Sequence, residues 1–240
     1  MRKKKKMSEV NLVAISKPNV GVTDCWDAND LIAYTARVSN PSNQNNTESA
    51  PRLLKYLIKH QHWSPFEMVH MTLEIKTTRD ISRQIIRHRS FSYQEFSQRY
   101  AESENFSTRM ARLQDPKNRQ ASIDIADADY GVGSEGAKTS ANGLVENWNM
   151  KQKKVIAVAK DAYNWALDNG IAKEQARVVL PEGNTGTTLY MAGSLRSWIH
   201  FCQLRMGIET QKEHRIVAEQ CWEHIKTHFP DIAEAVMENE

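Results

Sequence analysis

The spacing of hydrophobic positions along the chain predicts a few strands among many helices. From Val69 to Ile75, apolar and polar residues alternate, which predicts a half-buried strand over residues 68–76. A short apolar segment predicts another strand at 11–16. Helical spacing recurs in several segments, at about 27–38, 51–60, 80–88, 150–168, 191–205 and 209–228. Because strands and helices do not alternate regularly, we expect an α+β fold, with a small, mostly antiparallel sheet flanked by several helices.

Local signals set the boundaries of the predicted helices. Asp27 is expected to cap the first helix, and Thr77 and Thr78 offer a cap to the third. On that third helix Gln84 and His88 are four residues apart, so we expect them to share one polar face.

Residues 101–148 show no clear periodicity and are rich in Gly, Asp, Asn and Ser. We expect a long loop or insertion there, and loops of this length are usually functional or partly disordered. The rest of the chain is expected to form one domain over residues 10–230. A disordered basic tail at 1–9 and a C-terminal tail at 231–240 would flank it.

Composition and charge narrow the class of protein. The 240 residues are 40% hydrophobic and 25% charged, with a formal net charge of +3. Much of the positive excess lies in residues 2–6, so the body is close to neutral and gives weak support for a nucleic-acid footprint. No apolar run approaches the ~18–20 residues of a membrane span. The three cysteines fit a reducing, cytoplasmic compartment, and no metal, Rossmann or P-loop motif is present.

The segment 87–100 carries the strongest signal for chemistry. Arg87 and Arg89 flank His88, and the first acid downstream is Glu95. Like charges packed together repel one another unless an anion joins them, and arginine forks bind phosphate bidentately. A surface cluster of salt bridges is the alternative. The pattern favours a nucleotide or dinucleotide pocket.

The later helix supplies a second set of candidates. Arg196 and His200 would share one face, whereas Arg205 faces another way. His200 is either a satisfied core histidine or a ligand. Arg205 is either a surface partner of Glu209 or a binding group. Arg177 is either a snorkelling surface residue or an anion anchor.

These residues resemble the signature of the flavin-dependent thymidylate synthases. Arg87-His88-Arg89, seven residues and then Ser97 match the family's RHR-x7-S pattern. Further matches follow in order over most of residues 10–230: Thr35-Ala36-Arg37-Val38-Ser39, Ser64-Pro65-Phe66-Glu67, Arg83-Gln84, Ser97-Gln98-Arg99-Tyr100, Lys117-Asn118-Arg119-Gln120, Ala176-Arg177-Val178-Val179-Leu180-Pro181, and Leu195-Arg196 through His200-Phe201 to Leu204-Arg205. Two features depart from the pattern: Ser194 stands where many relatives have asparagine, and 101–148 is longer and richer in glycine than in compact members.

The resemblance implies a single domain of that family's fold and one activity, methylation of dUMP at C5 to give dTMP. It implies 5,10-methylenetetrahydrofolate as carbon donor, FAD as redox mediator and NADPH as reductant. The family forms a homotetramer whose active sites lie where subunits meet. Self-association is therefore expected, with neither a nucleic acid nor a membrane as partner.

The resemblance also implies roles for individual residues. Arg205 would be catalytic, favouring ionisation of the uracil N3. The residues that would contact FAD are His62, Ser64, Arg87, His88, Arg89, Glu95, Ser194, Leu195, Arg196 and His200. The residues that would hold dUMP are Gln84, Arg87, Glu95, Phe96, Ser97, Gln98, Arg99, Arg177 and Arg205.

Physical chemistry agrees with these implied roles. Arg99 and Arg177 suit a phosphate better than lysine would. A guanidinium fixed beside the pyrimidine would stabilise an enolate-like anion, by analogy with roughly 3–4 kcal/mol for one oxyanion donor. No cysteine has an activating setting, and this chemistry needs no thiolate. The redox chemistry belongs to the flavin, while the protein positions and polarises.

Two other functions stay open. A basic nucleic-acid-binding module would use the cluster of Arg87, Arg89 and Arg99, with an affinity that falls steeply with salt. A flavoprotein of this fold that had lost synthase activity would bind flavin without making dTMP.

Overall fold

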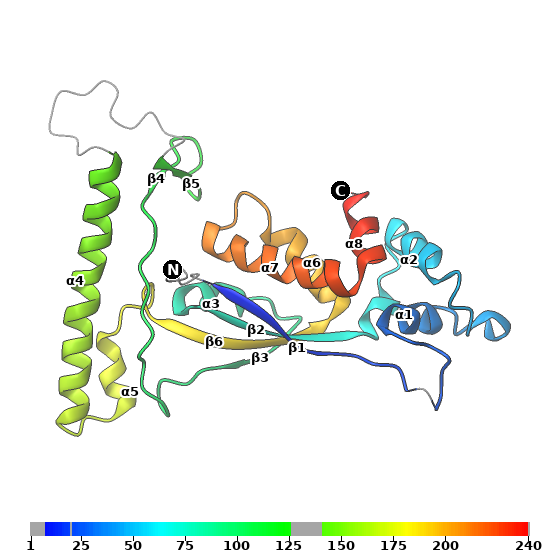
Figure 1. Cartoon of the computed structure of the whole chain (residues 1–240), viewed down its shortest axis with the longest axis horizontal. Helices are drawn as coiled ribbons and strands as arrows, with labels where there is room; N and C mark the ends of the chain where they lie inside the picture. The colour runs from blue at the N-terminus through cyan, green and yellow to red at the C-terminus, as the bar shows by residue number, and fades with distance from the viewer. Residues whose placement is uncertain (1–7, 20, 126–140, 240) are drawn as a thin grey trace, which may run out of the picture.

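One antiparallel sheet organises the molecule (Figure 1). The structure is a computed structural model and describes residues 8–19, 21–125 and 141–239. Sheet A contains four strands in the order β1 (Glu9–Ile15), β2 (His70–Thr78), β6 (Gly186–Ser194) and β3 (Ser92–Glu95). Every neighbouring pair is antiparallel, and β2 and β6 pair along their whole lengths. The α+β class expected from the sequence is confirmed.

Strand β6 corrects one prediction. Residues 191–205 were expected to be helical throughout, but 186–194 form β6 and the helix begins at 195. Within β6, Leu189 and Met191 are fully buried while Tyr190 is exposed, which is the alternation of a half-buried strand. The strand contains small and hydroxyl residues and runs directly into a helix. Its weak two-residue period was therefore hidden by the helical period that follows.

Three helices lie on one side of sheet A in Figure 1: α3 (Arg79–Ile85), α6 (Leu195–Arg205) and α7 (Lys212–His228). The main core fills the space between them and the sheet. Its largest side chains include Trp198, Phe201 and Phe66, which are at most 1% exposed. Trp198 also donates its indole N–H to the Met71 carbonyl at 2.9 Å, so α6 is fixed to β2 by a buried hydrogen bond as well as by packing.

The helix α3 is shorter than predicted. It ends at Ile85, so the expected helix at 80–88 is three residues too long, and Gln84 and His88 do not share a helical face. Thr78 occupies the N-cap position, but its hydroxyl donates to Asp80 Oδ1 at 2.6 Å and caps no backbone N–H. The chain then turns back into β3, and this turn carries the signature residues.

Three helices gather at one end of the sheet: α1 (Ala28–Ala36), α2 (Ala50–Lys59) and α8 (Pro230–Met237). The short 3-10 turn η1 (Pro41–Asn43) lies between α1 and α2, and η2 (Ser64–Glu67) lies between α2 and β2. Asp27 caps α1, as predicted, by accepting from the backbone N–H groups of Asn29 and Asp30 at 2.8 and 3.0 Å. The expected C-terminal tail at 231–240 contains most of α8, whose Ile232 and Val236 are buried.

The start of the chain also holds more structure than a basic tail at 1–9 would have. β1 begins at Glu9, and the Ser8 hydroxyl lies 3.2 Å from Thr77 Oγ1 in a buried position. The expectation for residues 1–7 lies outside the described residues.

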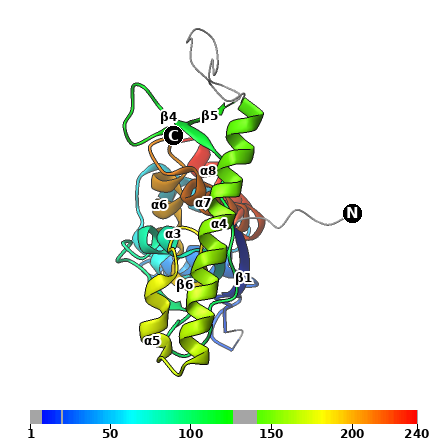
Figure 2. The ribbon, with the colours of Figure 1, turned by 90° about the vertical axis from the view of Figure 1, so that its left-hand side faces the viewer.

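At the opposite end of the sheet stands the long helix α4 (Ala141–Asp168), followed by α5 (Lys173–Ala176) and the 3-10 turn η4 (Arg177–Val179) (Figures 1 and 2). The helix begins at Ala141, about nine residues earlier than predicted, and Gly170 follows it in a left-handed conformation (φ 75°), as a C-terminal stop requires. A small second core joins α4 to the loop after α5 through Tyr163, Ala166 and Leu180.

The expected loop at 101–148 therefore divides into several parts. It contains β4 (Arg112–Gln114) and β5 (Ser122–Asp124), which form a two-stranded antiparallel hairpin, and the first two turns of α4. Residues 126–140 lie outside the described residues. Glycine and polar residues dominate this stretch, which hid both the short hairpin and the helix start from periodicity.

The helix α4 exposes an apolar stripe. Trp148, Val155, Val158 and Trp165 are between 46% and 62% exposed, and their spacing of seven, three and seven residues places them along one side. Large exposed apolar patches commonly mark interaction sites. No helix among the described residues is long and apolar enough to cross a bilayer.

Candidate active site

Arg87, His88 and Arg89 of the signature lie in the turn between α3 and β3, and Ser97 follows β3. Phe91 anchors this turn in the core, where its ring packs edge-on against Trp198 at 4.8 Å. Gly193 on β6 makes room for it, because a Cβ at that position would lie 2.4 Å from the Phe91 ring. Arg87 and Arg89 are exposed on either side, and neither has an acidic partner in the part of the chain that the structure describes. The turn therefore presents two uncompensated positive charges.

Between those two arginines, His88 faces the end of α6. Its Nε2 accepts a hydrogen bond from Arg205 Nε at 2.7 Å, and its ring packs edge-on against Phe201 at 4.9 Å. Burial, with a smaller contribution from the Arg205 charge, lowers the pKa of His88 to about 4. Arg205 therefore pairs with His88, and the surface pair with Glu209 is not formed.

Behind this pair lies a second histidine. His214 is 1% exposed, and its ring centroid is 6.5 Å from that of His88. Burial, followed by the charges of Arg205 and His88, lowers its pKa to about 3. Its Nε2 has no hydrogen-bond partner among the described residues. Two neutral imidazoles therefore lie beside one arginine at neutral pH.

Gln84 lies at the edge of the same region. It donates to Gln211 Oε1 at 2.7 Å, and Gln211 in turn donates to Glu213 Oε2 at 2.9 Å. The carboxylate of Glu213 is 1% exposed and binds Arg112 of the β4–β5 hairpin at 2.6 Å. A buried charge needs such a partner. This network ties the hairpin, the start of α7 and Gln84 together.

A separate group of charges surrounds Glu95, which we call the Glu95 cage. Glu95 accepts hydrogen bonds from Ser82 at 2.9 Å, Thr187 at 3.0 Å and Arg83 at 3.1 Å. Arg79 Nη1 lies 3.8 Å from the carboxylate, is buried, and has no hydrogen-bond partner among the described residues. The cage thus holds one carboxylate rigidly and leaves the buried Nη1 of Arg79 without a hydrogen-bond partner among the described residues.

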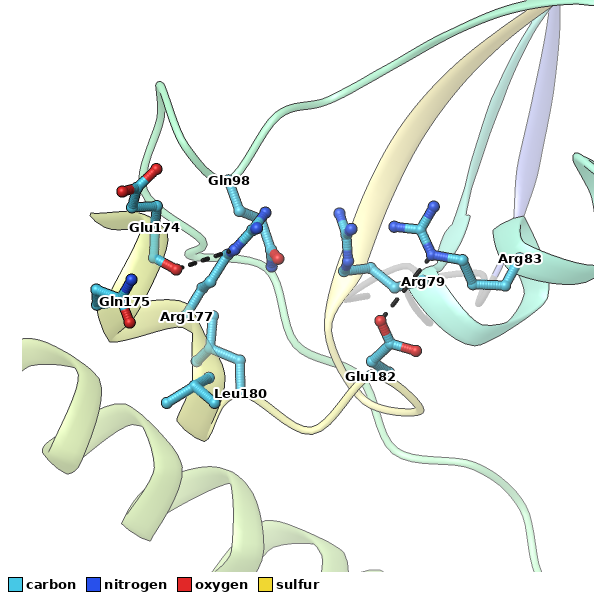
Figure 3. A pocket seen from close by; sticks show the side chains of 9 residues that line it. Arg79, Arg83, Gln98, Glu174, Gln175, Arg177, Leu180 and Glu182 are labelled. Atoms are coloured by element: carbon cyan, nitrogen blue, oxygen red, sulfur yellow. Dashed lines mark hydrogen bonds and ion pairs between the residues drawn. The ribbon is translucent and has the colours of Figure 1, made fainter. Parts of the chain in front are cut away.

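Beside the cage is a cavity of about 480 Å³ (Figure 3). Arg79 and Arg83 approach it from α3, and Arg177 approaches it from η4 on the facing side. Gln98 lines it as well, together with Glu174 and Glu182. Pockets of this size commonly hold small ligands. Three guanidinium groups around one cavity are suited to an anion.

The acids at this cavity already engage some of its cations. Arg99 lies 3.3 Å from the carboxylate of Glu174, and Arg177 donates its Nε–H to the Glu174 carbonyl at 3.2 Å. Glu182 is 4.0 Å from Arg83. These contacts are largely exposed, so a stronger anion could replace them at small cost.

A third group lies at the start of α6. Ser194 caps that helix, and its neighbour Ser197 donates to the Ser90 carbonyl at 3.3 Å. Arg196 binds Glu67 of η2 at 2.6 Å, and the His200 ring packs edge-on against Trp63 at 4.7 Å. Burial lowers the pKa of His200, so it too favours the neutral form.

The remaining predicted residues differ in accessibility. His62 and Ser64 are exposed beside this third group. The Leu195 side chain is fully buried, so only its backbone is available to a ligand. Phe96 is hydrogen-bonded through its backbone to β6, and the Ser97 hydroxyl accepts from the Arg99 N–H at 3.3 Å. Within one chain, the predicted residues therefore lie in three separate groups. One surrounds Arg205, one surrounds the Glu95 cage and its cavity, and one lies at the start of α6.

A larger groove runs between α4, the end of sheet A and the segment 100–108. Its volume is about 1670 Å³, which exceeds that of an ordinary ligand pocket. Phe96, Tyr100 and Phe106 line it together with Ile156 of α4. Its size suits a surface that another protein chain covers.

The cysteines offer no nucleophile. Cys25, Cys202 and Cys221 are free and buried, and burial raises the pKa of each thiol. Among the described residues, no group of three or more His, Cys, Asp or Glu side chains is placed to hold a metal ion.

The residues that are present fit a flavin dinucleotide. Its diphosphate needs cations, and the exposed Arg87 and Arg89 carry charge that no described acid balances. The capped start of α6 and the exposed His62 and Ser64 supply polar groups nearby. This set of donors is therefore suitable for binding a flavin diphosphate.

Sequence reasoning missed several residues of these groups. Arg79, Ser82 and Thr187 hold or face Glu95, and Glu213 anchors the hairpin through Arg112. Arg79 and Ser82 follow a strand in a helix of mixed polarity, and Thr187 lies in the strand that was not predicted. Helical spacing did not single out Arg79, because it stands at the start of a helix of mixed polarity and only the structure shows that it is buried.

Known proteins of one kind match this sequence over most of its length. A family model described as thymidylate synthase complementing protein matches residues 21–231. The chain is 47% identical over 227 residues to a probable flavin-dependent thymidylate synthase of Paramecium bursaria Chlorella virus 1, covering 94% of this chain and 97% of that protein. It is 44% identical over 230 residues to a flavin-dependent thymidylate synthase of Synechocystis, covering 95% and 99%.

Solved structures agree with the sequence relatives. The crystal structure of a UMP/dUMP methylase, PolB from Streptomyces cacaoi, bound with 5-Br dUMP, matches with a TM-score of 0.75 and 28% sequence identity. The match covers 96% of this chain and 95% of that one. A second structure of the same protein, bound with 5-Br UMP, matches equally well, with a TM-score of 0.75 at 27% identity, covering 97% and 94%.

Proposed function

The chain belongs to the family of flavin-dependent thymidylate synthases, and we propose that it methylates dUMP at C5 to give dTMP in the site described above. The carbon comes from 5,10-methylenetetrahydrofolate, and two electrons come from NADPH. The C5 hydrogen leaves as a proton, one further proton is taken up from solvent, and tetrahydrofolate and NADP⁺ are the other products. FAD, when bound, carries the electrons between the reductant and the one-carbon chemistry.

The observation that carries this proposal is the cavity lined by Arg79, Arg83 and Arg177. A nucleoside monophosphate carries close to two negative charges at its phosphate, and arginine forks match phosphate geometry. The solved structural neighbour is described as bound with 5-Br dUMP. In the proposal, Arg177 and Gln98 hold the phosphate, and Arg99 leaves Glu174 to join them. Ser97, Phe96 and Glu95 complete this half of the nucleotide site.

The other half of the proposed site surrounds Arg205. Its guanidinium lies beside the pyrimidine and stabilises the negative charge that develops when N3 ionises. That charge increases electron density at C5, which attacks the one-carbon unit. Gln84 and Arg87 bind the nucleotide from the same side. No thiolate adds to the ring, in agreement with the three buried cysteines.

The residues proposed to hold FAD come from two regions. Arg87, His88 and Arg89 approach it from the signature turn. The others surround the start of α6 and η2: His62, Ser64, Ser194, the Leu195 backbone, Arg196 and His200. Glu95 would lie between the flavin and the nucleotide.

We propose that the active form is a homotetramer with shared active sites. The apolar stripe of α4 (Trp148, Val155, Val158 and Trp165) and the large groove lined in part by Ile156 support this, because leaving them in water would be unfavourable. The family's expected assembly joins copies of the same chain. The three free cysteines support a cytoplasmic location, where thiols stay reduced.

No observation favours the alternative of a nucleic-acid-binding module. The cluster on which it depended is divided, because Arg99 pairs with Glu174 whereas Arg87 and Arg89 lie in the signature turn. A salt titration with DNA would detect such a function as a steep loss of affinity.

A turnover assay tests the proposed function. Purified protein with FAD, NADPH and methylenetetrahydrofolate should convert dUMP into dTMP, and omission of any one of them should stop product formation. The visible flavin bands should shift when dUMP is added. A folded, yellow protein whose bands shift but which makes no dTMP would mean that the fold has been retained without the synthase activity.

A further inference from the structure

The middle residue of the signature, His88, contacts the residue proposed to act on the pyrimidine. Arg205 Nε donates to His88 Nε2 at 2.7 Å, across 117 positions of sequence. The two residues come from different elements, the turn after α3 and the last turn of α6. Their contact is therefore a product of the fold and not of local sequence.

The direction of this hydrogen bond fixes the state of His88. Arginine stays protonated and can only donate, so the imidazole Nε2 must present its lone pair. His88 is then neutral and carries its proton on Nδ1. A protonated His88 would place two positive groups 2.7 Å apart and would lose the hydrogen bond.

The same bond orients Arg205. It uses only the Nε–H, and among the described residues Arg205 has no other hydrogen-bond or ion-pair partner. The two Nη groups therefore remain available to a ligand. Because the Nε edge of the guanidinium is fixed, the two Nη groups point in a defined direction. Bidentate recognition of a ligand needs this geometry.

The His88 ring is itself held in place. Phe201 packs edge-on against it, and the Tyr93 hydroxyl donates to the His88 carbonyl at 2.6 Å. The charged or titratable groups around the ring are Arg205 on α6, His214 on α7, Tyr93 on β3 and the adjacent Arg87. No acid among the described residues faces it. Nothing in this surrounding favours an imidazolium, and burial lowers the pKa of His88 to about 4.

We propose that His88 is a positioning residue for Arg205: as a neutral imidazole it accepts the Nε hydrogen bond and so aims the two Nη groups at the pyrimidine of the bound nucleotide. This inference rests on the proposed function. It gives His88 a role beyond the flavin contact that the family resemblance implies. A mobile arginine would have to be ordered in each turnover, whereas this one is ordered before the substrate arrives.

Two substitutions separate positioning from flavin binding. His88→Leu removes the acceptor and should lower kcat by about 100-fold, the loss expected from misplacing a catalytic group by about 1 Å. Because Arg87 and Arg89 remain to bind the flavin diphosphate, flavin content should change little, and so should the KM for dUMP. His88→Gln places an amide oxygen where it can accept from Arg205 Nε, and should recover most of kcat. His228→Gln, at the far end of α7, serves as the matched control.

Some results would overturn the inference. A His88→Leu enzyme with normal kcat would show that Arg205 needs no such support. Equal loss of flavin in both His88 variants would place His88 on the cofactor alone. Wild-type protein that makes no dTMP would instead remove the proposed function.

A measurement on the wild-type protein decides the contact without turnover. In ¹⁵N NMR spectra of the histidine side chains, His88 should be the Nδ1–H tautomer from pH 8 down to pH 5, and its Nε2 resonance should shift in Arg205→Ala. The proposal would be contradicted if His88 were the Nε2–H tautomer, or if its Nε2 resonance did not shift in Arg205→Ala. This outcome does not depend on the His88 variants.

Discussion

The Glu95 cage and the surroundings of Arg205 are both rich in arginine, but they balance their charges differently. In the cage, Arg79 and Arg83 lie against Glu95, and nearby Arg99 lies against Glu174. Around Arg205, no described acid pairs with Arg87, Arg89 or Arg205, and the neighbouring histidines are neutral. One region is thus compensated within the chain, whereas the other carries positive charge that only a ligand can balance.

This difference indicates what each region does when a nucleotide arrives. The compensated region must exchange partners, and its exposed pairs are weak enough to allow that. The uncompensated region needs no exchange, because its cations are already free of protein anions. Removing an acid should therefore damage the cage more than the Arg205 region.

The largest expected effect is the loss of the cage carboxylate. Glu95→Ala leaves the buried Arg79 without its acidic neighbour and should lower the free energy of unfolding by about 3–5 kcal/mol. Urea denaturation would measure this loss. Glu182→Ala, which removes a largely exposed partner of Arg83, should cost less than about 1 kcal/mol.

Similar losses in these two variants would mean that the cage is not a buried, compensated unit. Inorganic phosphate provides a further check, because an anion in the cavity should recover part of the stability lost in Glu95→Ala. If millimolar phosphate restores none of the lost stability, Arg79 is not part of the proposed anion site.

The next effect in size concerns the uncompensated region. Arg205→Ala should keep its flavin but lower kcat by about 10²–10³-fold, as removal of one group aimed at developing charge does in other enzymes. Steady-state dTMP formation measures it. Arg215→Ala on α7, whose partner Glu219 is 3.9 Å away, is the control and should be nearly normal. Near-normal kcat in Arg205→Ala would remove this residue from the chemistry.

The sequence predicted local elements better than their arrangement in space. The alternating segment before the signature, the capped helix at Asp27 and the glycine stop after α4 follow from local rules and were found. The strand β6 was missed because its inward residues are interrupted by small and hydroxyl residues. Without β6, the position of Thr187 beside Glu95 could not be foreseen.

Contacts between residues far apart in the sequence were also not predicted. Nothing local in the sequence says that His88 accepts from Arg205, or that Arg112 of the hairpin reaches Glu213. Periodicity also extended α3 to residue 88, which placed His88 on a helix face with Gln84. The turn that begins after Ile85 instead sends these two side chains to different partners, Arg205 and Gln211.

A further expected effect is a dependence of stability on pH. The folded-state pKa values of His88 and His214 are lowered to about 4 and 3, below the value of about 6.5 in an unfolded chain. The unfolded chain therefore binds more protons below pH 6.5, and stability should fall from there towards pH 4.5. His214 alone should contribute up to about 1.4 kcal/mol per pH unit.

Urea denaturation at several pH values tests this. His214→Phe should show a shallower loss of stability than the wild-type chain between pH 6.5 and 4.5. Parallel curves would mean that His214 does not stay neutral in the folded protein, and that the region around Arg205 is less free of competing charge than its geometry indicates.

The central claim follows from the proposed shared active sites: the cavity beside the Glu95 cage, lined by Arg177, and the Arg205 region of another copy would together close a single nucleotide site. Arg177→Ala and Arg205→Ala should each be almost inactive alone, because each destroys one region in every copy. Mixed in equal amounts and allowed to exchange subunits, they should recover about a quarter of the wild-type dTMP turnover, since random pairing leaves that share of shared sites intact. A mixture that exchanges subunits but stays as inactive as its components would contradict the account.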